Sequence, residues 1–142
     1  MHINTVKALN NIKKVFKDWK LDCDWNTNDG GFTVCASITI RNHDDSVRLA
    51  IDVGYDGWCD FRAVFDKIDK TAEVLNLINT FNGYSPFFHA FIRDDGYLEL
   101  SHSITCYGGE GVMKDHTEEY LRSISDLADN DVLLQLTART HS

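Results

Sequence analysis

The sequence is poor in proline, in basic residues and in long apolar runs. Proline occurs once in 142 residues, which argues against long linkers or disordered tracts. No apolar run approaches the roughly 20 residues of a membrane-spanning helix, so we expect no membrane partner. The 14 Lys and Arg stand against 22 Asp and Glu, a formal net charge of −8. That charge repels phosphate backbones, and we therefore expect no nucleic-acid binding.

Cysteine is sparse and widely spaced. The four residues Cys23, Cys35, Cys59 and Cys106 form no Cys-x-x-Cys pair and no zinc-ligand spacing. The first residues lead into a mixed, charged helix and not into the apolar segment of a secretory signal. We therefore expect four reduced thiols in a cytoplasmic protein. With 43% hydrophobic and 25% charged residues, the composition predicts one globular domain over residues 1–142.

Residues 3–19 predict an amphipathic helix. Its apolar positions recur at spacings of three and four, and are Ile3, Val6, Leu9, Ile12, Val15, Phe16 and Trp19. Its lysines are Lys7, Lys13, Lys14, Lys17 and Lys20. A basic amphipathic helix can lie on a membrane, but the acidic remainder of this chain would be repelled by anionic lipid. We favour a first helix packed on a sheet.

A four-stranded antiparallel meander is predicted next, because apolar and polar residues alternate with a period of two. The strands are expected around residues 21–25, 32–41, 47–53 and 58–65. Asp29-Gly30-Gly31 supplies the positive φ angles of a tight turn between the first two.

A second helix is predicted over residues 70–82, with Asp69 as N-cap and Gly83 as a left-handed stop. Asn79 and Asn82 are expected to cap and brace its junction with a hairpin of residues 87–93 and 97–104. Asp95-Gly96 favours a type I′ turn there. A last helix starts at Val112 and ends or kinks at residues 129–131. The order α-ββββ-α-ββ-α predicts an α+β fold on an antiparallel sheet.

No motif of a known chemistry is present. The acidic clusters lack calcium-loop spacing, and Gly108-Gly109-Glu110-Gly111 lacks the Lys-Ser/Thr ending of a phosphate loop. We expect no cofactor, no metal and no enzymatic activity. One alternative stays open: His102 falls on the apolar side of its strand, so a small-molecule sensor or small enzyme could use a pocket near His102, Cys106 and His116. Otherwise His102 is a core-edge histidine bonded to a backbone carbonyl.

Aromatic residues near turns and on strand faces offer a possible interaction surface. They are Trp25, Tyr55, Trp58, Phe61 and Tyr97. Exposed aromatics on a sheet mark protein or ligand contact. The alternative is a second helix layer that covers them.

The chain resembles the YbjN family, within the group that shares the type III secretion chaperone-like fold. The resemblance rests on Leu77-Ile78-Asn79-Thr80-Phe81-Asn82, on the hairpin from Phe88 to Leu100, and on the glycine-containing link to a last amphipathic helix. It covers most of the chain in element order, with the motif itself within about residues 70–125. It implies a binding or regulatory module of bacterial origin, an unknown protein partner and a homodimer. It carries over no functional residue, and the predicted meander has one strand more than the simpler chaperone pattern.

Overall fold

The computed structural model describes residues 3–44, 46–54, 57–105 and 111–141, and only the backbone at residues 3, 4 and 111. Its helices are α1 (Ile3–Asp18), α2 (Ala72–Tyr84), α3 (Gly111–Asp126), a 3-10 turn η1 (Leu127–Asp129) and α4 (Asp131–Thr137). Its strands are β1 (Asp24–Asn28), β2 (Gly31–Thr39), β3 (Ser46–Val53), β4 (Trp58–Ile68), β5 (His89–Ile92), β6 (Tyr97–Thr105) and β7 (Thr140–His141). The predicted α+β order is confirmed, with α4 and β7 added after the kink at residues 127–130.

The strands form one antiparallel sheet within the described residues. Its order is β1-β2-β3-β4-β6-β5, and β7 pairs with the last residues of β4 on the side of β3, beyond the final β3–β4 pair of Arg48 and Val64. The meander and the hairpin are therefore joined through β4 and β6, whose register pairs Phe61 with His102 and Ala63 with Leu100. The β4–β6 pairing shifts between Val64 and Lys67, and Lys67 pairs with Tyr97 of β6 on one side and with His141 of β7 on the other.

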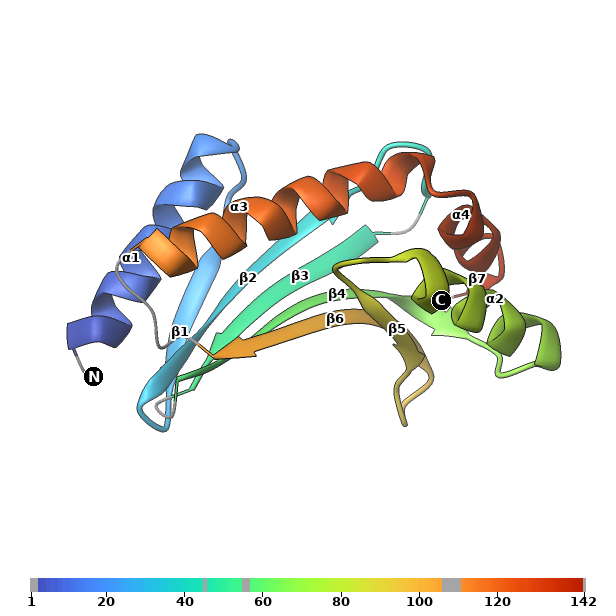
Figure 1. The fold of residues 1–142 in the computed structure, drawn as a ribbon, viewed down its shortest axis with the longest axis horizontal. Helices are drawn as coiled ribbons and strands as arrows, with labels where there is room; N and C mark the ends of the chain where they lie inside the picture. Colours follow the sequence, from blue (N-terminus) through green and yellow to red (C-terminus); the bar gives the residue numbers. More distant parts are fainter. Residues whose placement is uncertain (1–2, 45, 55–56, 106–110, 142) are drawn as a thin grey trace.

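Two helices cover one face of the sheet. Figure 1 shows α1 and α3 side by side across the strands, with α2 and α4 gathered at the far end and no helix drawn on the opposite face. The period-two alternation of the strands turns their apolar residues toward α1 and α3, where Phe16, Phe32, Ile51 and Tyr120 are fully buried. The opposite face carries polar and charged residues together with Trp58 and Tyr97, and among the described residues no second helix layer covers these two aromatics.

The ends of α2 differ from the prediction. Thr71, and not Asp69, is the N-cap: its backbone is extended and its Oγ1 accepts a hydrogen bond from the Val74 N–H at 3.1 Å. A hydroxyl at that position satisfies a first-turn N–H that Asp69, two residues earlier, does not reach. Gly83 lies inside the helix without a positive φ, and the helix ends where the Ser85 N–H bonds to the Phe81 carbonyl.

The β1–β2 turn lies where it was predicted, whereas the β5–β6 turn is of a different type from the one predicted. Asp29 and Gly30 have positive φ angles, 21° and 85°, and close the β1–β2 hairpin at the predicted place, whereas Gly31 is the first residue of β2 and has no positive φ. The β5–β6 turn is not type I′. Only Gly96 has a positive φ there. The Gly96 N–H donates to the Arg93 carbonyl, and the Arg93 N–H donates to the Tyr97 carbonyl. This pattern is a three-residue loop with a glycine bulge.

Candidate protein-interaction surface

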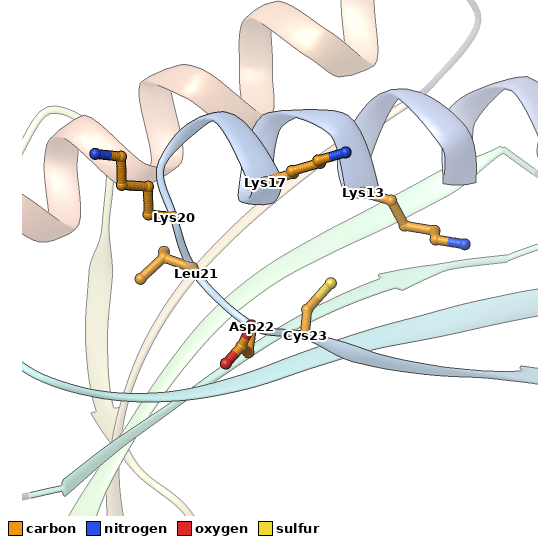
Figure 2. A pocket seen from close by; sticks show the side chains of 6 residues that line it. All are labelled: Lys13, Lys17, Lys20, Leu21, Asp22 and Cys23. Carbon is orange, nitrogen blue, oxygen red and sulfur yellow. The ribbon is translucent and has the colours of Figure 1, made fainter.

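A hollow of about 370 Å³ lies between the end of α1 and the segment that leads into β1. It is lined by Lys13, Lys17, Lys20, Leu21, Asp22 and Cys23. In Figure 2 the first two lysines extend from α1, whereas Leu21, Asp22 and Cys23 come from the segment below, with the sulfur of Cys23 directed toward the helix. Since residues four apart share one face of a helix, the spacing of Lys13 and Lys17 places both beside this hollow.

The end of α1 sets the path of the chain around the hollow. The Leu21 N–H bonds to the Phe16 carbonyl and the Lys20 N–H to the Lys17 carbonyl, each at 2.9 Å. Lys20 has a φ of 58°, the left-handed conformation that glycine usually supplies at a helix end. The chain therefore reverses sharply at Lys20 and runs on into β1.

Cys23 is not an activated nucleophile. Burial raises the pKa of its thiol, Lys13 opposes that shift, and Asp24 and Asp22 add to it. A thiol with a raised pKa is mostly protonated at neutral pH, and the thiolate is the reactive form. The hollow is therefore better suited to binding than to covalent chemistry.

Strand β1 borders the hollow and forms a free edge of the sheet. All five of its residues are exposed, and within the described chain it pairs only with β2. Asn28 pairs with Gly31 across the two-residue turn. Because hydrogen-bonded and non-bonded pairs alternate in an antiparallel ladder, the backbone N–H and C=O groups of Trp25 and Thr27 point outward. The Trp25 side chain is 45% exposed, and the Lys13 ammonium lies 5.0 Å from its ring centroid.

The predicted aromatic residues do not gather on one surface. Phe61 is fully buried beneath α3, so it belongs to the core and cannot contact a partner. Trp25 lies at the β1 edge, on the side of the sheet that α1 covers. Trp58 and Tyr97 belong to the opposite face, with Trp58 52% exposed. Tyr55 lies outside the described residues. The role of the remaining aromatics stays a prediction.

Tyr97 is surrounded by cations from three strands or their ends. The charged groups of Arg48, Lys67 and Arg93 lie 5.0, 5.5 and 5.7 Å from its ring centroid. Arg93 also forms ion pairs with Asp95 at 2.8 Å and Glu99 at 3.8 Å. Cation–π contacts in this group stabilise the face of the sheet opposite α1 and α3. The group could not be predicted from the sequence because its members are far apart along the chain.

His102 is held by core packing. Its Nδ1 donates to the Phe87 carbonyl at 2.9 Å, and its ring stacks on Phe87 with the centroids 4.1 Å apart. Nδ1 of His116 is buried without a hydrogen-bond partner in the described part of the chain. Cys106 lies outside the described residues, so a pocket formed by His102, Cys106 and His116 stays a prediction.

Among the described residues, no group of three or more His, Cys, Asp or Glu side chains is placed to hold a metal ion. None of the helices described has both the length and the apolar character needed to cross a membrane. Cys23 and Cys35 are free thiols.

Sequence reasoning missed the hollow itself. The spacing of Lys13, Lys17 and Lys20 in the predicted first helix is the part of the hollow that the sequence shows. What the sequence could not supply was the path of residues 21–23 under the helix, because that path depends on the left-handed turn at Lys20.

Comparison with known proteins gives a family and a fold. A model of the YbjN family, described as "Putative bacterial sensory transduction regulator", matches residues 8–132. No curated protein matches the chain. Among solved structures, "Crystal Structure of the ExsC-ExsE Complex" aligns with a TM-score of 0.59 and 14% identity, covering 92% of this chain and 93% of that one. "Structure of the HopA1-SchA Chaperone-Effector Complex" aligns with a TM-score of 0.52 and 10% identity, covering 91% and 98%.

Proposed function

The chain belongs to the YbjN family, whose model matches residues 8–132, and we propose that it is a non-catalytic, chaperone-like module that binds a protein partner. The fold supports this proposal, since both structural neighbours are components of protein complexes, one of them named as a chaperone with its effector. At 14% and 10% identity these neighbours establish the fold alone, so the binding role rests on the surface of this chain.

The free edge of β1 is the observation that carries the proposal. A strand with unpaired backbone groups is a template for an added strand, and proteins use such edges to bind extended peptides. The other edge of the sheet is less open, because the side chain of Asn82 occupies both backbone groups of Ala90 on β5. We therefore place the partner as an extended segment along β1, beside the hollow under α1.

Site-specific photocrosslinking in cells of the source organism tests this placement. A photoreactive residue at Asn26, exposed on β1, should form adducts with a discrete partner, and the same residue at Asn79, exposed on α2, should not. Thr27→Pro removes one outward N–H, leaves the bonds of Asn26 and Asn28 to β2 intact, and should abolish the adduct, whereas Thr27→Ala should retain it. Absence of adducts at Asn26, or equal adducts at both positions, would contradict the proposal.

We extend the proposal to a cytoplasmic homodimer, as the resemblance to chaperones of this fold implies. Light scattering should then give a mass of twice 16.2 kDa, and a monomer at micromolar concentration would remove the dimer from the proposal. Cell fractionation should recover the chain with cytoplasmic markers. The free thiols of Cys23 and Cys35 are consistent with a reducing compartment.

A further inference from the structure

The beginning of the chain carries charge opposite to the rest. Residues 1–20 contain five lysines and one aspartate, a formal charge of +4, so the remaining residues carry −12. A local positive region on an acidic protein attracts acidic partners selectively, because the rest of its surface repels them.

The lysines of the hollow are available for an external anion. Within the described residues, Lys13, Lys17 and Lys20 have no carboxylate within ion-pair distance. Asp22 is the single acidic side chain among the lining residues, so the lining keeps an excess of positive charge. Lys20 also holds a left-handed conformation that glycine adopts at lower cost, and the chain nevertheless places a cation there.

The lining also includes apolar surface. Leu21 and Cys23 are half-buried in its wall, and the half-exposed Trp25 ring lies next to it under Lys13. A ligand that combines carboxylates with apolar side chains matches these groups better than a small inorganic anion does. The free backbone of β1 alongside is suited to an extended chain.

A membrane surface is a poor match to the same lysines. The apolar side of α1 is already buried in the protein through Leu9, Ile12 and Phe16, so these residues are not available to insert into lipid. The charge of −12 on the remainder of the chain opposes an extended anionic surface such as a lipid bilayer more strongly than a single short segment, which contacts the lysines at close range.

We infer that the hollow recognises acidic side chains of an extended protein segment that lies along β1. This inference rests on the proposed function and adds the chemistry of the partner: Asp or Glu residues that contact Lys13, Lys17 and Lys20, interspersed with apolar residues that contact Leu21 and Trp25. Neutral or basic segments of the same length bind weakly.

Fluorescence anisotropy with three labelled 12-residue peptides tests the charge rule. The peptides share Val and Leu at alternate positions and carry Glu, Gln or Lys at the others. The Glu peptide should bind about ten-fold more tightly than the Gln peptide, as a few exposed ion pairs allow, and raised salt should reduce that difference. Equal affinity for the Glu and Gln peptides, or no binding of the Glu peptide, overturns the inference.

A pair of charge-reversal variants locates the effect. Lys13→Glu with Lys17→Glu should remove the preference for Glu, whereas Lys70→Glu with Lys114→Glu makes the same change in net charge at exposed lysines outside the hollow and should preserve it. Equal losses in both variants would overturn the inference. Vesicles of phosphatidylcholine and phosphatidylglycerol should not compete with the Glu peptide, and competition by them would assign the lysines to lipid instead.

The two proposals fail in different ways. Suppose that the Asn26 adduct forms and is undiminished in the Lys13→Glu, Lys17→Glu variant. Then the inferred preference for acidic side chains is wrong, whereas the proposal that a partner binds along β1 is retained. If no adduct forms at Asn26, the binding edge is wrong whatever the peptides do. Circular dichroism of every variant confirms that the helices and the sheet are retained.

Discussion

Asn82 of α2 makes two hydrogen bonds to a single residue of the edge strand β5. Its Nδ2 donates to the Ala90 carbonyl at 3.0 Å and its Oδ1 accepts from the Ala90 N–H at 2.6 Å. An asparagine side chain presents one donor group and one acceptor, as a peptide group does. Asn82 therefore takes the place of a neighbouring strand and ties α2 to the hairpin.

Replacement of Asn82 should be costly. Asn82→Ala leaves both backbone groups of Ala90 without their partner in a half-buried position, and we expect a loss of about 2 kcal/mol in the free energy of unfolding. Asn79→Ala, on the exposed side of the same helix, should change it by less than about 0.5 kcal/mol. Urea denaturation followed by circular dichroism measures both. Similar values for the two variants would show that the paired hydrogen bonds are not a source of stability.

Two glycines should respond to alanine in opposite directions. A Cβ at Gly31 would lie 2.0 Å from the Val53 carbonyl oxygen, a backbone atom that cannot give way alone. A Cβ at Gly83 meets nothing within 4 Å, and Gly83 lies within α2. Gly31→Ala should therefore destabilise the sheet by more than about 2 kcal/mol, whereas Gly83→Ala should stabilise the protein by about 0.4–1 kcal/mol. Thermal unfolding of the two variants gives the comparison, and a tolerated Gly31→Ala would place β2 and β3 farther apart than described.

Part of this fold could be predicted because local patterns determine it. The period-two alternation of β2 and β3 predicts which of their residues face the core. Asn79 and Asn82 were both expected to cap and brace the junction between helix and hairpin; Asn82 bonds to β5 there, whereas Asn79 is exposed on α2. The cap of α2 was predicted at Asp69 because both Asp69 and Thr71 are suitable cap residues, and only the path of the chain selects between them. Strand β7 has two residues, too few for any periodic signal, and depends on pairing with the distant Lys67 and Ile68.

The candidate site was less accessible to sequence reasoning. Lys13 and Lys17 are visible as a spacing on a helix, but the hollow needs residues 21–23 to pass under that helix. Of the predicted aromatic set, Phe61 proved to be core because β6 and α3 place His102 and Tyr120 against it. Those contacts join residues 41 and 59 positions apart in the sequence, so no local pattern encodes them.

Glu99 gives the stability a predictable dependence on pH. Burial raises the pKa of its carboxyl, Arg62 and Arg93 oppose the shift, and Asp95 and Asp52 add to it. A carboxyl whose pKa is higher in the folded state binds protons more strongly there, so its ionisation destabilises the fold as pH rises above the ordinary Glu value of about 4.3.

Glu99→Gln should consequently be at least as stable as the parent protein at pH 7, with its advantage shrinking as pH falls toward 4. Arg93 keeps an ion pair with Asp95 in this variant, which limits the loss from removing the carboxylate. The midpoints of urea denaturation, measured for both proteins between pH 4 and 8, give the difference in stability at each pH. A difference that is constant with pH, or that grows in favour of Glu99→Gln on acidification, would contradict the raised pKa.

Two substitutions of Lys20, by glycine and by alanine, separate the effect of its backbone conformation on stability from the effect of its charge on binding. Its φ of 58° costs a side-chain-bearing residue about 1 kcal/mol relative to glycine, so Lys20→Gly should be more stable than Lys20→Ala by about that amount in urea denaturation. Both variants remove the same ammonium group from the hollow, and we expect both to weaken binding of the Glu peptide equally, by about two- to five-fold for one exposed ion pair. Equal loss of binding despite unequal stability would identify the charge of Lys20 as what the partner contacts. If binding instead followed stability, Lys20 would serve the turn alone, and the acidic segment would have to contact Lys13 and Lys17 only.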